Sequence, residues 1–194
     1  VTLVAFILGV IIAYQSAVAM RQFGAEVYVA DLIGISMVRE LAPLMTAILL
    51  AGRSGAAFAA EIGTMQVNEE VDALTTFGFD PVRFLVLPRV LAALAVTPLL
   101  AVYADVVSIL GGALILLTFQ VPLVTYFNEV FTLVQMNDLL GGLFKCLVFG
   151  LVIAGIGCLR GLQTDRGAAG VGLATTRSVV SALVLIVLVD GGFA

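Results

Sequence analysis

Charged residues inside apolar stretches are the first candidates for chemistry in this 194-residue chain. Arg53 lies within the apolar run Leu41 to Gly63, and Asp190 lies within the last apolar run. An arginine at the centre of a bilayer costs about 2.5–3.5 kcal/mol, so it needs a partner or water. At about 1.5 Å per helical residue, Asp190 lies closer to the depth of Arg53 than Asp105 does. We therefore predict an ion pair between Arg53 and Asp190, with a role in packing favoured over one in transport.

The chain offers little for catalysis. It has no histidine, and Lys145 is its single lysine, which stands in no Gly-x-x-x-x-Gly-Lys-Ser/Thr motif. Ser54 lacks the Gly-x-Ser-x-Gly spacing and has no histidine to activate it. Cys146 and Cys158 share one apolar run and are expected to be small buried or lipid-facing residues. We expect no catalytic residue, metal site or bound cofactor in this chain, and hence no enzyme.

A short acidic segment, Thr64–Gly78, separates two strongly apolar stretches. Val67, Val71 and Leu74 follow helical spacing and give it one apolar face, and Gly78 is suited to end the helix. Its acidic residues are Glu69, Glu70 and Asp72. A helix of about 12 residues is about 18 Å long, too short to span a bilayer. Interfacial helices are normally rich in Lys and Arg, so this one suits a basic groove on a soluble protein better than lipid headgroups, although a solvated connector is an alternative.

Composition indicates which elements must position these residues. The chain is 62% hydrophobic and 11% charged, against about 45–50% and 25% in soluble domains. We predict an all-α polytopic membrane protein with five transmembrane helices and one short acidic helix outside the bilayer. The net charge of −4 and the lack of a basic stripe argue against nucleic acid. The predicted spans are 3–20, 41–63, 88–119, 139–159 and 178 to the end, with polar segments at 21–40 and 160–177.

Lysine and arginine counts give a direction to this topology. Five basic residues flank the acidic segment and the loop between the last two spans, against three on the other side. Cytoplasmic loops carry the excess of basic residues, so the acidic segment is predicted to be cytoplasmic. In the second span, small residues recur every four positions at Ala51, Gly55, Ala59 and Gly63. Such a stripe favours close packing between helices, within the chain or at a subunit interface or cavity.

Several motifs, in order and in spacing, resemble the MlaE (YrbE) family of ABC-transporter permeases over almost the whole chain. They are Arg39-Glu40-Leu41-Ala42-Pro43, the runs 51–65 (AGRSGAAFAAEIGTM) and 69–74 (EEVDAL), and the runs 79–92 (FDPVRFLVLPRVLA) and 174–180 (ATTRSVV). The resemblance implies one permease domain over residues 1–194. Because the sequence starts at Val1 rather than Met and both opens and closes within apolar runs, we expect it to be part of a longer chain that continues at both ends. It implies an inner-membrane homodimer that moves phospholipid between membranes.

The resemblance also implies partners and site residues. A cytoplasmic ABC ATPase would bind ATP and Mg, a periplasmic MCE-domain protein would carry lipid, and a STAS domain, separate or fused, is possible in longer relatives. Thr64–Gly78 matches the coupling helix of the family. The residues expected to touch the ATPase are Glu69, Glu70, Asp72, Leu74 and Phe77. By position, the lipid pocket at the dimer interface would involve Phe23, Arg39 and Glu40.

Two other classes of function stay open at this stage. The first is an ion-coupled secondary transporter or channel with Arg53, Asp105 and Asp190 as a relay, although the sequence lacks inverted repeats and broken-helix pairs. The second is a membrane scaffold or an enzyme subunit. Transport that depends on an ion gradient rather than on ATP would favour the first class.

Overall fold

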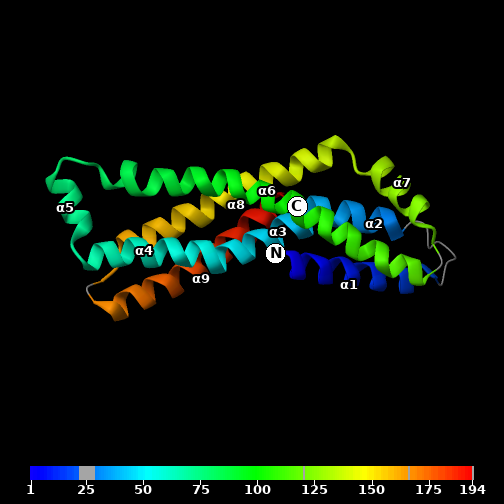
Figure 1. Cartoon of the computed structure of the whole chain (residues 1–194), viewed down its shortest axis with the longest axis horizontal. Helices are drawn as coiled ribbons and strands as arrows, with labels where there is room; N and C mark the ends of the chain where they lie inside the picture. Colours follow the sequence, from blue (N-terminus) through cyan, green and yellow to red (C-terminus); the bar gives the residue numbers. More distant parts are fainter. Residues whose placement is uncertain (22–28, 120, 166, 194) are drawn as a thin grey trace. The chain divides into compact units, whose positions relative to one another are not determined.

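The computed structural model describes residues 1–21, 29–119, 121–165 and 167–193, and all regular structure in them is helical (Figure 1). The α-helices are α1 (Thr2–Arg21), α2 (Val29–Ser36), α3 (Ala42–Leu50), α4 (Ala56–Val67), α5 (Glu70–Thr76), α6 (Leu87–Thr118), α7 (Leu123–Leu133), α8 (Met136–Leu162) and α9 (Ala168–Phe193). Three π-helical segments, Met37–Leu41, Ala51–Gly55 and Val82–Val86, join α2 to α3, join α3 to α4 and precede α6. The predicted all-α fold is confirmed.

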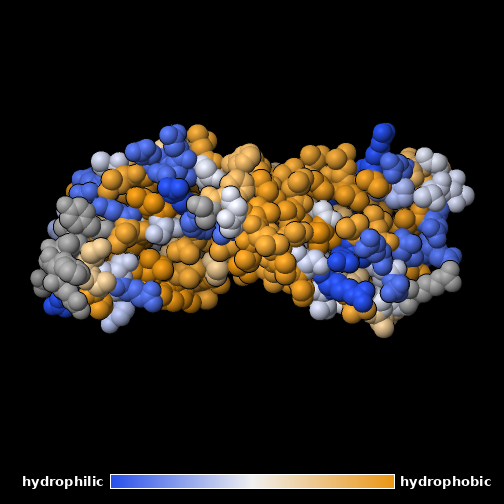
Figure 2. All heavy atoms as spheres, turned by 180° about the vertical axis from the view of Figure 1, so that it is seen from behind, coloured by the Kyte–Doolittle hydropathy of each residue, from blue (hydrophilic) through white to orange (hydrophobic). Residues whose placement is uncertain are grey.

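Five helical stretches in the described part of the chain are long and apolar enough to cross a membrane. They are Thr2–Arg21, Val29–Val67, Val82–Thr118, Met136–Leu162 and Ala168–Phe193. Each reaches the roughly 20 residues that a bilayer requires. On the face drawn in Figure 2, hydrophobic residues predominate and hydrophilic residues gather in separate patches. The protein is therefore a multi-pass membrane protein, as predicted.

The second predicted span begins too late. We expected residues 21–40 to be a polar connection, whereas one continuous helical stretch runs from Val29 to Val67. Ala30, Ile33 and Met37 lie on one face of its start and are almost completely buried. The stabilisation gained by burying this apolar face keeps the segment helical, although polar residues such as Asp31 and Ser36 lie between the buried ones.

Two of the π-helical segments have a local cause in the sequence. Met37–Leu41 lies two residues before Pro43, and Val82–Val86 lies two residues before Pro88. Proline has no N–H to donate and its ring clashes with the carbonyl four residues earlier. The N–H of the residue before each proline instead bonds the carbonyl five residues back, from Ala42 to Met37 and from Leu87 to Val82. The helix widens for one turn and continues without a break.

The chain divides into two compact units. Unit 1 comprises Val1–Thr46 and Pro98–Lys145, and unit 2 comprises Ala47–Thr97 and Cys146–Ala194. The helices α3, α6 and α8 each contribute residues to both. Each unit thus has its own packed interior, assembled from segments that are far apart in the sequence.

Unit 1 contains a helix that the sequence analysis missed. α7 lies between the predicted third and fourth spans and packs against α2. Tyr126 on α7 is completely buried and donates a hydrogen bond of 3.0 Å from its hydroxyl to the carbonyl of Ile109. Burial raises the pKa of Tyr126 well above its ordinary value, so the phenol stays protonated as a donor. With 11 residues, α7 is too short to span, which is why a search for long apolar runs overlooks it.

Unit 2 is built around the predicted stripe of small residues. Ala51, Gly55, Ala59 and Gly63 are all buried. A Cβ placed on Gly157 of α8 would lie 2.8 Å from the backbone oxygen of Gly55. The stripe therefore packs within the chain, and glycine lets the backbones approach closely.

Gly157→Leu is expected to destabilise the protein by about 1–3 kcal/mol, because the new side chain overpacks the contact with Gly55. The matched control is Gly155→Leu on the same helix, where an added Cβ meets nothing within 4 Å. Thermal unfolding of the purified protein in detergent measures both. Equal midpoints for the two variants would contradict a close contact at Gly157.

Candidate functional site

Arg39 and Glu40 lie in the π-helical segment Met37–Leu41, inside the second membrane-crossing stretch. Lys145 of α8 donates to Glu40 Oε2 at 2.6 Å, and its side chain is only 7% exposed, against 38% for Glu40. A lysine so deeply buried needs an anionic partner, because desolvation strongly penalises its charged form. The carboxylate of Glu40 is therefore held by a protein cation and is less available than the sequence analysis expected.

Arg39 is placed differently from Glu40. Its guanidinium lies 3.7 Å from Asp138 on the first turn of α8, and its side chain is 57% exposed. An exposed pair at that distance is weak, so this guanidinium is available to another anion. Phe23, the third predicted lipid-binding residue, lies outside the described residues.

A close helix approach brings α8 to this π-helical segment. A Cβ on Gly142 would collide with the backbone carbonyl of Val38, so only glycine fits there. Lys145 follows Gly142 by three residues and therefore lies on the same face of α8. The site thus depends on the uncharged Gly142 and on the π-helical turn before Pro43, which carries Arg39 and Glu40.

The predicted pair of Arg53 and Asp190 stays a prediction. Arg53 lies in the π-helical segment Ala51–Gly55 and is exposed. Asp190 lies on α9. The ion pairs found among the described residues do not include one between these two side chains.

The acidic segment differs from the single helix predicted for Thr64–Gly78. α4 runs on to Val67, the chain turns at Asn68 and Glu69, and α5 has only seven residues. Glu69 has φ of 60°, a left-handed conformation that costs a non-glycine residue about 1–2 kcal/mol. The sequence analysis overlooked this corner because no glycine or proline marks it.

The predicted end of the segment is confirmed. Gly78 has φ of 83°, and the N–H of Phe79 bonds the carbonyl of Leu74 at 3.0 Å, as in a Schellman motif. Val71 is buried on the side facing the protein, while Phe77 is 77% exposed. Of the other residues predicted to contact the ATPase, Leu74 is half-buried, and Glu69, Glu70 and Asp72 are exposed.

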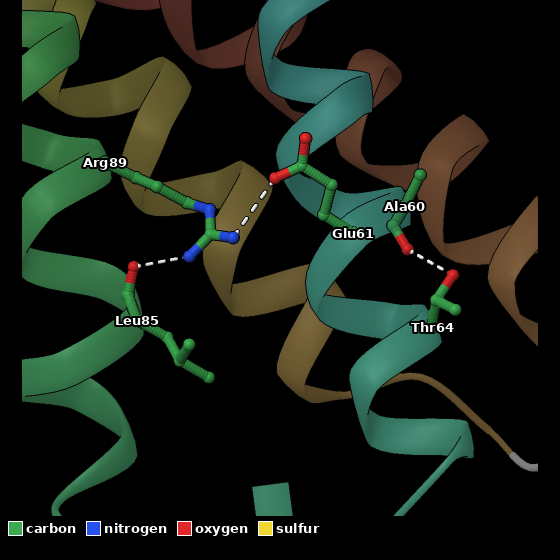
Figure 3. Close-up of polar contacts among 5 residues, drawn as sticks. All are labelled: Ala60, Glu61, Thr64, Leu85 and Arg89. Carbon is green, nitrogen blue, oxygen red and sulfur yellow. Dashed lines mark hydrogen bonds and ion pairs between the residues drawn. The ribbon is translucent and has the colours of Figure 1, made fainter. Parts of the chain in front are cut away.

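Two further polar features have surroundings that the sequence analysis did not predict. Arg89 of α6 donates to Glu61 Oε2 at 3.1 Å and to the carbonyl of Leu85 at 2.8 Å (Figure 3). Asp105 is 7% exposed, and its Oδ1 has no hydrogen-bond partner in the described part of the chain. Helical spacing could have suggested that Arg89 and the later residues of α6 share a face, but not which helix lies opposite.

Cys146 and Cys158 are both buried, as the apolar run containing them suggested. Within residues 1–21, 29–119, 121–165 and 167–193, no three His, Cys, Asp or Glu side chains group as metal ligands do.

Several known proteins are similar to this chain over nearly its full length. A permease of Rickettsia typhi, named as a probable ABC transporter permease, is 39% identical over 97% of this chain and 73% of its own. A Synechocystis protein, also named as a probable ABC transporter permease, is 42% identical over 92% of this chain and 68% of its own. The Arabidopsis thaliana protein TRIGALACTOSYLDIACYLGLYCEROL 1, chloroplastic, is 34% identical over 94% of this chain and 52% of its own. Since the model of the family Permease MlaE also matches residues 1–194, this chain belongs to the MlaE family of ABC transporter permeases.

Proposed function

We propose that this permease moves phospholipids between membranes as a homodimer in the bacterial inner membrane, driven by a separate cytoplasmic ATPase. A periplasmic MCE-domain protein would exchange lipid with it, and a STAS-domain protein is a further candidate partner. The observation that carries the proposal is the exposed acidic surface of α5, attached directly to a membrane-crossing helix. The name of the Arabidopsis relative contains that of a lipid, which supports lipid as the cargo.

The coupling step follows from how α5 is attached. α5 contacts α4, and the buried Val71 fixes it there while its acidic residues face outward. α4 in turn packs against α9, and its small residues meet α8 closely. A force on α5 therefore passes into several membrane-crossing helices. Packed helices of this kind move between discrete arrangements rather than deform gradually.

The lipid-binding step is assigned to Arg39. Its guanidinium is more than half exposed and only weakly held by Asp138, so a headgroup phosphate can replace that carboxylate. Glu40 is assigned a different role, because its carboxylate neutralises the buried ammonium of Lys145. Two copies of the chain would then enclose the acyl chains between apolar helix faces.

Reversing charge at the acidic surface tests the coupling step. Glu69→Lys with Glu70→Lys should abolish co-purification of the ATPase and ATP-driven lipid transfer, since both carboxylates are exposed and would meet a basic groove. The control is Gln135→Lys with Asn137→Lys, two exposed residues near the start of α8. Full ATPase binding by the first variant, or transfer that follows an ion gradient and survives ATP depletion, would contradict the proposal.

Arg39→Gln should reduce the phospholipid that co-purifies with the protein by about tenfold while leaving the thermal midpoint unchanged. The physical reason is that an exposed pair adds little to stability, whereas the guanidinium would bind phosphate directly. Arg83→Gln is the control, because Arg83 is also exposed and also pairs with an aspartate. Lipid phosphorus measured per permease decides the outcome, and equal loss in both variants would exclude a specific role for Arg39.

Glu40→Gln should instead lower stability, by about 3–5 kcal/mol, because the buried Lys145 loses its carboxylate partner. Adding Lys145→Met should recover most of that loss, since the charge that needs the carboxylate is removed. Thermal unfolding of both variants in detergent measures this. If the double variant is less stable than Glu40→Gln alone, Glu40 does not serve to neutralise Lys145.

A further inference from the structure

Unit 2 contains an apolar groove that takes no part in the proposed coupling or headgroup binding. It has a cavity volume of about 120 Å³ and lies among the second membrane-crossing stretch, α6 and α8. Its lining residues are Leu50, Ser54, Phe58, Ala92, Ala93, Val96, Thr97 and Ile153. An apolar cavity of about 150 Å³ stays dry and binds a molecule such as benzene. A cavity of this size and lining is thus suited to hydrocarbon rather than to water.

Small side chains and one close contact keep the groove open. A Cβ on Gly150 would lie 3.0 Å from the carbonyl oxygen of Ala93 and 3.0 Å from the hydroxyl of Thr97, so α8 and α6 nearly touch. Small side chains in the lining, namely Ser54, Ala92 and Ala93, leave the space between the larger ones unfilled. The Thr97 hydroxyl donates to the carbonyl of Ala93 at 2.7 Å, which turns it away from any ligand. The groove therefore offers mainly methyl and methylene surface.

An ion pair stands at one end of the groove. Arg89 precedes Ala92, Ala93 and Val96 by three, four and seven residues, which places it on the same face of α6. Glu61 follows Phe58 and Ser54 by three and seven residues and shares their face of the helix. The two side chains meet at 3.1 Å across α6 and α4 (Figure 3). Glu61 is 60% exposed, so one partner of the pair is open to its surroundings.

We propose that this groove binds one acyl chain of a phospholipid whose headgroup lies at Arg89 and Glu61. Both parts of an amphiphile find a match, because the phosphate suits the guanidinium of Arg89 and an amine suits Glu61. The groove lies within membrane-crossing helices, where phospholipid is the surrounding solvent. Ala92 and Val96 line it and are exposed, which gives a chain a lateral way in. This site belongs to unit 2, whereas Arg39 belongs to unit 1, and it does not depend on the proposed transport.

Photo-crosslinking tests the site. The probe is phosphatidylethanolamine with a diazirine near the end of one acyl chain, added to the full-length permease purified in dodecylmaltoside. We expect label on the peptides that contain residues 50–58 and 92–97. Ala92→Phe fills the mouth of the groove and should lower this label about tenfold, as expected for excluding about two methylene groups. Ala95→Phe is the matched control, since Ala95 is exposed on the same helix but does not line the groove.

Further variants make the outcome decisive. Ser54→Leu fills the groove from the opposite helix and replaces Ala92→Phe if that variant does not fold. Arg89→Gln should reduce labelling by the phospholipid but not by a diazirine alkane without a headgroup. The proposal would be overturned if Ala95→Phe lowered the label as much as Ala92→Phe, or if neither groove-filling variant lowered it. It would also be overturned if Arg89→Gln left labelling by the phospholipid unchanged. An interchain disulfide formed by Ala92→Cys in membranes would also overturn it, because a second copy would then cover the groove. Label on peptides around Glu40 reports the headgroup site of the proposed function separately.

Discussion

Close contact between helix backbones is the constraint on which the rest of this structure depends. In a bilayer the lipid is as apolar as the helix surfaces, so dispersion contacts at short range hold helices together. Gly157 meets the backbone of Gly55 in unit 2, and Gly142 meets that of Val38 in unit 1. Any side chain at these positions would push the helices apart. The ion pair of Lys145 with Glu40 lies beside the contact of Gly142 with Val38, so its geometry depends on that approach.

The charged groups inside the helices rely on this close packing. Lys145 reaches Glu40 because α8 approaches the π-helical turn at Gly142, three residues earlier. Burial makes such a pair intolerant of losing one partner, although it adds little net stability over an apolar pair. Arg39, next to Glu40 in sequence, stays largely exposed. The π-helical turn thus places two neighbouring charges differently: Glu40 pairs with the buried Lys145, whereas Arg39 is available to a ligand.

Two prolines change the helix geometry of the turn that precedes them. Pro43 and Pro88 each follow a π-helical segment at the same spacing, and each segment carries an arginine, Arg39 or Arg83. Widening the helix for one turn displaces the side chains of that turn from the regular helical positions. Local backbone geometry and the placement of charge are therefore linked in this fold, and π-helical turns of this kind often mark functional sites.

The sequence alone determined the helical class, the membrane-crossing character of the long apolar runs and the stripe of small residues from Ala51 to Gly63, because these depend on composition and on spacing within one helix. It also located Gly78, since a left-handed helix end favours glycine. It did not reveal the corner at Glu69, the short helix α7, or the partners of Glu40 and Arg89. The partners of Glu40 and Arg89 arise where segments far apart in the chain meet, as when Lys145 lies against Glu40. Spacing within a helix says which side chains share a face, and only tertiary packing decides what lies opposite that face.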